Sequence, residues 1–339
     1  MHPRLFPAQV GSVSFWDGKK VLVTGGSGFV GSHLIEQLLA AGKDARVTAA
    51  DNFSHSGPDN LAAVADRIKV EKVDLGDPRQ CDGLCSGQDV VMHLAARVRG
   101  VAYNQAHPAT MFRENVRMTS FILEAAQKAG VERVLVVSSA CVYPSGCTIP
   151  TPESEGFSGC PDQANDGYGW AKRMAEYEAM AMRKEFGLRS AIVRPYNCYG
   201  PRDRFDEDSA HVIPSLIRRF VSGEDPVTVW GDGSQTRAFL FVEDFARGLV
   251  EITERYAECD PVNLGTDEEI SIRDLVALVR ELCGSGAKVR FDPSKPSGQA
   301  RRNCDTAKAR LKAGFQARVP LREGLKRTID WYRRNIHAS

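Results

Sequence analysis

Three polar side chains have the types and the spacing of a proton-transfer site. Tyr168 and Lys172 lie four residues apart in the segment YGWAK, whose pattern is helical, so we expect both side chains to project from one face of a helix. A free tyrosine has a pKa of about 10, too high for a base at neutral pH, and a neighbouring ammonium would stabilise its phenolate. Ser139 ends an expected strand, and its hydroxyl would orient a reacting oxygen. Because this spacing of tyrosine and lysine is common, the interpretation depends on the elements that position them.

The first half of the chain has the pattern of a parallel sheet covered on both faces. Fully apolar, β-branched runs alternate with longer amphipathic segments, which is typical of strands buried between helices. The right-handed crossover rule then predicts a doubly wound α/β fold of the Rossmann type. The expected strands are Lys20–Thr24, Arg46–Ala50, Ile68–Val73, Val90–Leu94, Val134–Ser138 and Ser190–Val193, and the clearest helices are Val30–Ala41, Ala109–Ala129 and Tyr168–Phe186.

The regular alternation ends after about Arg194, where proline and glycine become frequent. We expect the rest of the chain to form a smaller α/β C-terminal substrate lobe, with one segment returning to the sheet. The expected division is an N-terminal extension over 1–18, a cofactor domain over 19–195 with 236–262 returning to it, and a substrate lobe made of 196–235 and 263–339. Within the second half we expect a strand at Arg237–Val242, helices at Asp244–Glu254, Ile272–Leu282 and Leu321–Arg334, and a loop at Pro293–Ala300.

The segment VLVTGGSGFVGSHL carries a dinucleotide-binding pattern. Gly25, Gly28 and Gly31 are spaced three apart, after an apolar strand and at the start of an amphipathic helix. Glycines let the backbone turn tightly and approach a pyrophosphate, whose charge is stabilised at the helix N-terminus. Asp51 follows Gly31 by 20 residues, at the end of the second strand. A carboxylate at that place accepts hydrogen bonds from a ribose 2′-hydroxyl and repels a 2′-phosphate, so the sequence predicts NAD rather than NADP. The positive charge of its oxidised nicotinamide would add to that of the lysine in stabilising a tyrosine phenolate.

Composition argues against several other classes of function. The 44 lysines and arginines nearly balance 43 aspartates and glutamates, so the chain lacks the basic excess of a nucleic-acid-binding protein. No pattern of metal ligands is visible, and the nine cysteines lack C-x-x-C spacing, so we expect reduced thiols and no metal. The N-terminal sequence lacks a signal-peptide pattern, and no apolar run approaches the roughly 20 residues that span a bilayer. The expected compartment is therefore the cytoplasm, without membrane attachment.

These motifs resemble those of the extended short-chain dehydrogenase/reductases, in the branch of sugar-nucleotide epimerases and dehydratases. The likeness runs from about Lys20 to Trp331 and includes TGGSGFVGS, HLAA, SSACVYP, YGWAK, RPYNCYGPRD and GDGSQTRAFLFVEDFARG. The resemblance implies an NAD-dependent enzyme in which Ser139, Tyr168 and Lys172 are catalytic. It also implies that the cofactor is bound by Gly25, Gly28, Phe29, Val30, Gly31, Asp51, Asn52, Asp74, Leu75, Leu94, Ala95, Ala96, Asn115, Tyr168 and Lys172. Alternatives stay open for three of these: a plain strand-end turn for Asp74 and Leu75, and a hydrogen bond within the helix for Asn115.

Two further residues indicate which members of the family the chain resembles most. Cys141 in SSACVYP matches the acid/base cysteine of GDP-mannose 3,5-epimerases and GDP-L-fucose synthases, and His211 in SAHVIPSLIRRF matches the partner histidine of the synthases. GDGSQTRAFLFVEDF and Asp51 are more similar to the epimerases, which use NAD, whereas the synthases prefer NADPH. The dehydratases have an Asp-Glu pair where this chain has Ala140 and Cys141, which argues against dehydration.

The resemblance implies epimerisation through a transient 4-keto sugar. Oxidation at C4 acidifies the hydrogens on C3 and C5, and a thiol with a pKa of about 8.5 and an imidazole of about 6.5 both exchange protons near neutrality. Tyr168 would act as the base at O4, and Cys141 with His211 would form the epimerising pair. The alternatives are a small buried apolar role for Cys141 and an ordinary loop position for His211.

Three residues match substrate-binding positions of the family. Asn197 in RPYN and Arg237 in QTRAF correspond to contacts with the sugar and the diphosphate, and Lys295 corresponds to a diphosphate-binding lysine of the synthases. Cations beside a diphosphate are chemically suitable. The alternatives are an exposed charge on an edge strand for Arg237 and a cation in a mobile loop for Lys295.

Three functions therefore remain open at this point. The first is a redox-neutral 3,5- or 5-epimerase of a nucleotide-diphosphate hexose such as GDP-mannose, with a simple 4-epimerase as its variant. The second is an epimerase-reductase of a GDP-4-keto-6-deoxy sugar, and the third is a silent Rossmann protein that only binds NAD. Asp51 favours the first function, and the intact Tyr168 and Lys172 argue against the third. The helices Ala109–Ala129 and Tyr168–Phe186 would pair across a two-fold axis in a homodimer, as in the family, or would pack only on their own sheet.

Overall fold

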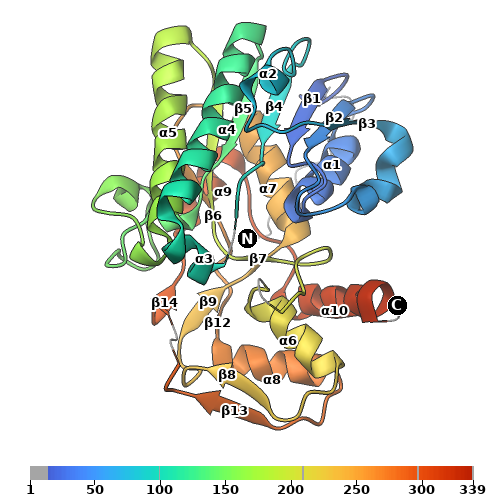
Figure 1. Cartoon of the computed structure of the whole chain (residues 1–339), viewed down its shortest axis with the longest axis vertical. Coiled ribbons are helices and arrows are strands. Elements are labelled where there is room, and N and C mark those ends of the chain that lie inside the picture. Colours follow the sequence, from blue (N-terminus) through green and yellow to red (C-terminus); the bar gives the residue numbers. More distant parts are fainter. Residues whose placement is uncertain (1–13, 99, 208–209, 296–297, 338–339) are drawn as a thin grey trace, which may run out of the picture.

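Among the described residues, seven parallel strands form the central sheet of the molecule (Figure 1). The computed structural model describes residues 14–98, 100–207, 210–295 and 298–337. The strand order is β11-β6-β5-β4-β1-β2-β3, which reverses direction between β1 and β4 and confirms the predicted doubly wound α/β fold. The strands are β1 (Lys20–Thr24), β2 (Arg46–Asp51), β3 (Ile68–Lys72), β4 (Val90–His93), β5 (Arg133–Val137), β6 (Ser190–Pro195) and β11 (Val262–Leu264).

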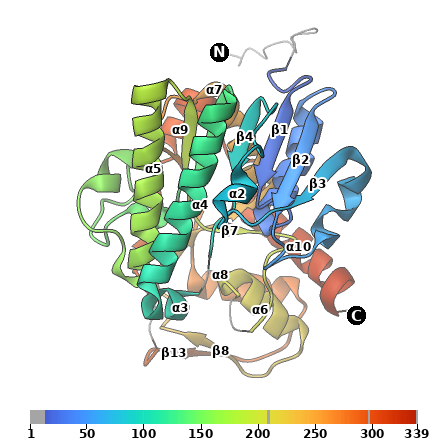
Figure 2. The same ribbon diagram turned by 45° about the horizontal axis from the view of Figure 1, so that its top comes forward.

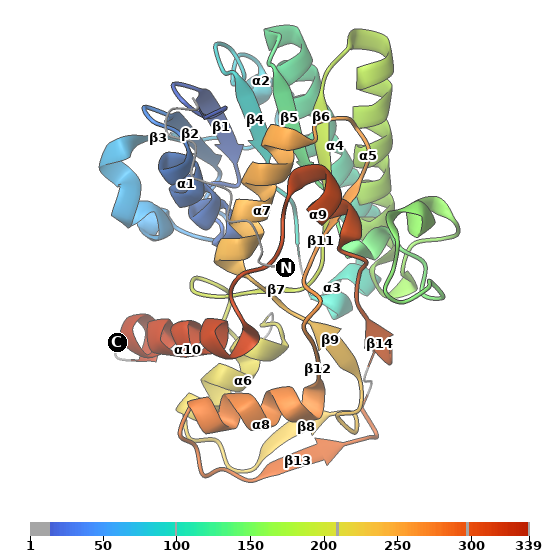
Figure 3. The same cartoon turned by 180° about the vertical axis from the view of Figure 1, so that it is seen from behind.

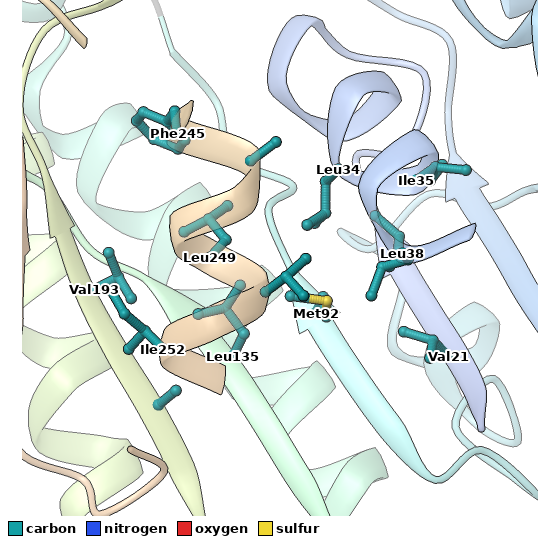
Figure 4. Close-up of a cluster of buried hydrophobic side chains, with 14 of the residues drawn as sticks. Val21, Leu34, Ile35, Leu38, Met92, Leu135, Val193, Phe245, Leu249 and Ile252 are labelled. Carbon is teal, nitrogen blue, oxygen red and sulfur yellow. The ribbon is translucent and has the colours of Figure 1, made fainter. Parts of the chain in front are cut away.

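Helices cover both faces of this sheet. One face carries α1 (Phe29–Ala41), α7 (Val242–Arg255) and α9 (Ala307–Ala313) (Figure 3), and the other carries α2 (Pro78–Cys81), α4 (Pro108–Ala129) and α5 (Asp166–Phe186). The short helix α3 (Val101–Ala106) packs at the lower ends of α4 and α5 (Figure 1). In the core under α1 and α7, Leu38 and Leu249 point toward Met92 on the sheet (Figure 4), and all three side chains are fully buried. The apolar periodicity of both helices is therefore used to bury one face of each against the strands.

Two strand predictions were wrong in detail. β3 is not fully apolar and buried, because it lies at the edge of the sheet and exposes Lys69 and Val70. The single strand predicted at Arg237–Val242 is interrupted at Phe239, which separates β9 (Thr236–Ala238) from β10 (Leu240–Phe241), and these two strands belong to different small sheets.

The cofactor half includes more of the chain than expected at two places. Residues 1–13 of the expected extension lie outside the described residues, but Trp16 is fully buried in the core beneath α1. The packed part of the chain therefore begins before position 19. The returning segment is also longer than 236–262, because β11 runs to Leu264 in the main sheet and Ala309 of α9 belongs to the same core.

The smaller lobe lies beside the carboxyl ends of the central strands (Figures 1 and 2). Its core unites α6 (Val212–Val221), α8 (Ile272–Leu282) and α10 (Leu321–Tyr332) through side chains such as Phe220, Leu275 and Leu325. The last helix ends at Tyr332, slightly earlier than expected, and is followed by a turn over Arg333–His337. The elements of the lobe in the described ranges, beside β9 and β10, are α6 (Val212–Val221), α8 (Ile272–Leu282), α10 (Leu321–Tyr332), β7 (Cys198–Tyr199), β8 (Val227–Trp230), β12 (Glu269–Ser271), β13 (Val289–Asp292) and β14 (Arg301–Arg302). None of the helices in these ranges combines the length and the apolar character needed to cross a membrane.

Candidate active site

The glycine turn between β1 and α1 has the shape of a cradle for a phosphate group. Gly25 adopts a left-handed φ of 70°, and a Cβ added there would lie 2.9 Å from the backbone nitrogen of Ala95. A Cβ on Gly31 would lie only 2.1 Å from the carbonyl oxygen of Gly25. Gly28 precedes α1, whose first residues are Phe29 and Val30, and it offers no side chain that caps the helix. The first backbone N–H groups of α1 are therefore available for a pyrophosphate, and the residues present fit a bound dinucleotide.

Asp51 lies at the end of β2, next to this turn. Its two carboxylate oxygens accept hydrogen bonds from the backbone N–H of Ser27, at 3.1 Å, and of Phe53, at 2.9 Å. The first bond fixes the carboxylate beside the glycine turn, as the selection of a ribose hydroxyl requires. Asn52 follows it, and its side chain accepts a hydrogen bond from the N–H of Ser54.

The remaining residues expected near the cofactor follow β3 and β4. Asp74 is exposed and accepts a hydrogen bond from the N–H of Gly76 at 2.9 Å, while Leu75 is buried. Leu94, Ala95 and Ala96 form the half-buried segment that leaves β4 beside the glycine turn.

Asn115 on α4 is buried and uses its amide within the chain. Its Oδ1 accepts from the N–H of Arg97 at 2.9 Å, and its Nδ2 donates to the carbonyl oxygens of Arg97 and Met111. Asn115 therefore connects the segment after β4 to α4. The alternative from the sequence analysis was a hydrogen bond within the helix, and Asn115 makes that bond to Met111 as well as the two bonds to Arg97.

Ser139, Tyr168 and Lys172 meet at the carboxyl end of β5. Nζ of Lys172 lies 5.5 Å from the centroid of the Tyr168 ring and donates a hydrogen bond of 2.8 Å to the carbonyl oxygen of Val137. The Ser139 side chain is hydrogen-bonded to Tyr168, and its Oγ also accepts from the N–H of Cys141 at 3.1 Å. The structure thus brings together the triad that the sequence predicted.

Burial is the largest influence on the pKa values of Tyr168 and Lys172. It lowers the pKa of Lys172 to about 8, because the charged ammonium is poorly solvated. It raises the pKa of Tyr168, and the nearby Cys141 raises it further, whereas the hydrogen bond with Ser139 lowers it. The charge of the lysine therefore does not offset the effect of burial on the pKa of the tyrosine. The positive charge of an oxidised nicotinamide is the further contribution that this site needs.

A buried ion pair that the sequence analysis missed supports α5, the helix that carries Tyr168 and Lys172. Glu176 lies one helical turn after Lys172 and is fully buried, and it pairs with Arg194 on β6 through contacts of 2.7 and 2.8 Å. Ser138 donates a further hydrogen bond to Glu176. The signal available in the sequence was the spacing of Glu176 from Lys172, which places both on one helix face.

Cys141 lies in the first turn after Ser139, within the short helix Ala140–Val142. Its sulfur lies 3.9 Å from Nη2 of Arg302, a residue 161 positions away that the sequence analysis did not select. Arg302 is on β14, which pairs with β9 so that Arg302 faces Arg237 in the register. A guanidinium beside the sulfur places a positive charge where a negative charge develops on deprotonation.

His211, Asn197 and Arg237 line a cavity of about 610 Å³ at the top of the lobe. The Asn197 side chain donates a hydrogen bond of 3.0 Å to the carbonyl oxygen of Ala238 on β9. Burial, followed by the charge of Arg302, lowers the pKa of Arg237. The other lining residues are Cys198, Tyr199, Ala210, Val212, Ile213, Pro214, Ser215, Leu216, Arg218, Arg219, Thr228, Val229, Trp230, Gln235, Phe239 and Ile272.

One expected substrate residue lies apart from this group. Lys295 is exposed on the turn after β13 and is not among the described residues that line the cavity. Residues 296 and 297 of the predicted loop are outside the described ranges. Within those ranges, histidine, cysteine, aspartate and glutamate do not gather into a group that could hold a metal ion, and all nine cysteines are free thiols.

Known proteins are similar to this chain in sequence and in fold. The profile of the NAD dependent epimerase/dehydratase family matches residues 21–265. GDP-L-fucose synthase 1 from Arabidopsis thaliana is 36% identical over 250 residues, covering 73% of this chain and 77% of its own. A dTDP-4-dehydro-6-deoxy-D-allose reductase from a Streptomyces species is 34% identical over 324 residues, covering 94% of this chain and 97% of its own. The structure of a dTDP-glucose 4,6-dehydratase from Streptomyces venezuelae, solved with NAD bound, superposes with a TM-score of 0.82 at 28% identity, covering 94% of this chain and 98% of its own.

The family match covers the glycine turn, Asp51, the triad and Arg237, which are the parts of the site described above. It also extends through β11, the last strand of the central sheet. The fold and the cofactor site therefore agree with the sequence relationship. The chain belongs to the NAD dependent epimerase/dehydratase family of enzymes, with NAD as its cofactor.

Proposed function

We propose that this enzyme is an NAD-dependent epimerase of a nucleotide-diphosphate hexose, which inverts C3, C5 or both through a transient 4-keto sugar. The observation that carries the proposal is the meeting of Ser139, Tyr168, Lys172 and Cys141 at the end of β5. The first three residues suit oxidation at C4, and the thiol adds a group that hydride transfer alone does not require.

When bound, NAD would accept the hydride from C4 of the sugar, and its oxidised ring would contribute a positive charge to the site. Tyr168 removes the proton from the 4-hydroxyl as that hydroxyl becomes a carbonyl, and Ser139 orients the oxygen by a hydrogen bond. Lys172 keeps its positive charge below about pH 8 and lies over the Tyr168 ring, where it stabilises the phenolate.

Cys141 and His211 are proposed to exchange the protons on C3 and C5. Each group removes a proton made acidic by the 4-keto group or returns one to the opposite face. Arg302 connects the two regions, because it lies beside the Cys141 sulfur and also faces Arg237, which lines the cavity together with His211. A sugar near Cys141 with its diphosphate near Arg237 would extend along this row of side chains.

An epimerase-reductase is the second candidate. The fucose synthase and the allose reductase among the relatives favour it, and the same residues would then act on a 4-keto-6-deoxy sugar with consumption of a reduced cofactor. Asp51 favours NAD over NADP but does not fix the direction of hydride transfer. A simple 4-epimerase would need the triad and neither Cys141 nor His211.

The test is an NMR product assay in deuterated water with GDP-mannose or a GDP-4-keto-6-deoxyhexose as the probe, after mass spectrometry of the ligands released from the purified protein. Label at C3 or C5 of GDP-mannose with steady absorbance at 340 nm supports the redox-neutral epimerase. Loss of NADH absorbance with the keto sugar supports the epimerase-reductase. Inversion at C4 of a nucleotide-diphosphate hexose without label at C3 or C5 would contradict both.

The cysteine is tested by Cys141→Ser, which should suppress label uptake at one of the two carbons. The matched control is Cys160→Ser, because Cys160 is an exposed free thiol. Undiminished uptake at both carbons in Cys141→Ser would reject the assigned role.

We further propose that the enzyme is a cytoplasmic homodimer that pairs through α4 and α5. Phe112 on α4 and Tyr177 on α5 are exposed at 39% and 63%, so each helix has an aromatic side chain directed away from the sheet. Sedimentation of the wild-type protein and of Phe112→Ser/Tyr177→Ser should give a dimer and a weakened dimer, respectively.

A further inference from the structure

A buried carboxylate lies beneath His211 at the edge of the cavity. Asp203 is 8% exposed, and its Oδ1 lies 4.0 Å from Nδ1 of His211. Oδ1 accepts a hydrogen bond from the N–H of Arg204 at 2.8 Å, whereas the buried Oδ2 has no hydrogen-bond partner among the described residues. An unsatisfied buried oxygen is costly, so its retention indicates a partner that arrives in another state of the site.

The turn that carries Asp203 is held in an uncommon conformation by the cofactor helix. Arg202 has a left-handed φ of 68°, which is unusual for a residue other than glycine and must be imposed by its surroundings. Its guanidinium pairs with Glu36 of α1 at 2.5 Å, and His33 of α1 donates from Nε2 to the carbonyl oxygen of Pro201 at 3.0 Å. These two contacts anchor the turn on the helix that begins at the glycine cradle.

His211, by contrast, has little that fixes its ring. Its side chain is 72% exposed, and it precedes α6 at the rim of the cavity without making a side-chain cap hydrogen bond. A histidine that must accept a proton from one defined carbon needs a defined tautomer and ring orientation. Of the groups described around it, the Asp203 carboxylate lies 4.0 Å from the ring nitrogen, a separation that closes to a hydrogen bond by a small rotation.

We propose that Asp203 is the positioning residue of His211, holding the Nδ1–H of the imidazole so that Nε2 faces the substrate as the proton-exchanging atom. The proposal rests on the function proposed above for His211. In the step, the C–H bond at C3 or C5 breaks and its electrons form the enolate of the 4-keto sugar, while the proton bonds to Nε2. The carboxylate then balances the imidazolium until a proton is returned to carbon.

The electrostatics around Asp203 agree with this arrangement. Burial raises the pKa of the carboxyl to about 6, and the neighbouring His211 is the largest opposing influence, since it favours the charged carboxylate. The backbone N–H of Arg204 and the charge of its side chain also lower this pKa. A carboxylate whose ionisation depends on its histidine is suited to respond to the proton that the histidine carries.

The first test reads the tautomer of His211 directly, without any substrate. In ¹⁵N NMR of the full-length protein with NAD, the signal missing from His211→Gln identifies this ring. We expect the neutral wild-type ring to carry its proton on Nδ1. In Asp203→Asn the amide can donate to Nδ1, so the proton should move to Nε2. The Nε2–H form in both proteins would overturn the proposal.

The second test separates positioning from a structural role. In the deuterium assay with the probe sugar, Asp203→Asn should slow uptake about tenfold or more at the carbon that His211→Gln affects. Uptake at the other carbon and hydride transfer should stay within about twofold, and Asp203→Asn should add nothing in the His211→Gln background. Equal losses at both carbons, or additive effects, would mean that Asp203 only supports the fold.

The matched control is Glu207→Gln, which removes an exposed carboxylate of the same segment that pairs with Arg218 at 2.7 Å. It should leave both carbons unaffected. If His211→Gln itself leaves uptake at both carbons unchanged, the proposed function of His211 fails along with its positioning. If His211→Gln acts and Asp203→Asn does not, only the present proposal fails.

Discussion

The cofactor half and the substrate lobe hold their chemical groups in opposite ways. Lys172 is 5% exposed and donates to the end of β5, whereas the His211 side chain is 72% exposed at the rim of a cavity. On the cofactor side, the glycine turn and the triad lie at the carboxyl ends of β1 and β5, two parallel strands on either side of β4. On the substrate side, the lining comes from five elements of the lobe, which are β7, α6, β8, β9 and α8.

This difference shows where each part of the reaction is prepared. The groups proposed for hydride transfer are held by burial, which limits the reorganisation needed during a reaction. The His211 side chain, which is proposed to act on the sugar, is largely exposed to solvent. Substitutions in the cofactor half should therefore abolish chemistry or stability, and those in the lobe should have smaller effects.

The largest effect is expected for Tyr168→Phe, which removes the base of the cofactor half. Loss of a positioned acid/base group lowers the rate by about 10²–10⁴-fold. Single-turnover NADH formation at 340 nm measures this step, with NAD content of the purified protein as the control for folding. For comparison, Trp230→Ala alters a cavity residue that is 60% exposed and should change KM more than the rate. A loss below tenfold in Tyr168→Phe would contradict the proposed role.

The next effect concerns the buried ion pair under α5. Glu176→Gln leaves the Arg194 guanidinium buried without its carboxylate and should cost about 3–5 kcal/mol in the free energy of unfolding. Urea titration measures this loss. The lobe provides the matched control Glu281→Gln, because Glu281 pairs with Arg322 at the surface, where both side chains are more than half exposed. Exposed ion pairs of this kind contribute little to the free energy of unfolding. If Glu176→Gln and Glu281→Gln lost the same free energy, the cofactor half and the lobe would not differ in how they hold their charges.

A smaller effect is expected from adding one methyl group to the glycine turn. In Gly31→Ala the Cβ would lie 2.1 Å from the Gly25 carbonyl oxygen, so the turn must open at a cost of about 1–3 kcal/mol. Both the melting temperature and the bound NAD should fall. Gly286→Ala in the lobe is the control, since no atom lies within 4 Å of its added Cβ. Full NAD content in Gly31→Ala would show that the turn does not bind the pyrophosphate.

The smallest effect is the pH dependence of stability that two buried histidines of the cofactor half produce. Burial lowers the pKa of His93 to about 3, with Lys172 the next cause, and lowers that of His33 to about 4. The unfolded chain binds more protons on these residues as the pH falls below about 6.5, so the folded state loses stability toward acid. Urea midpoints at pH 7.5 and pH 5 should therefore differ by less in His93→Gln than in the wild type. At pH 7.5 and above, both imidazoles are neutral in the folded and in the unfolded protein. Their protonation should therefore no longer change the urea midpoint with pH. If the urea midpoint of His93→Gln fell below pH 6.5 as steeply as that of the wild type, His93 would not be a source of the acid sensitivity.

Much of the cofactor half could be predicted from the sequence because its signals are local. The spacing of Gly25, Gly28 and Gly31 defines a turn, and the spacing of Tyr168 and Lys172 defines one face of a helix. Alternating apolar strands and amphipathic helices then determine the doubly wound order through handedness rules. These features depend on residues near one another in the chain, so periodicity alone reveals them.

The tertiary structure alone decided which distant residues meet these groups. Arg302 reaches Cys141 across 161 positions, Arg194 neutralises Glu176, and Asp203 lies beneath His211 on a turn anchored to α1. The pKa of Tyr168 was also decided there, since burial rather than the lysine dominates it. Desolvation and ion pairing depend on what surrounds an atom in space, and a sequence pattern carries no record of neighbours brought together only when the sheet and the lobe fold against each other.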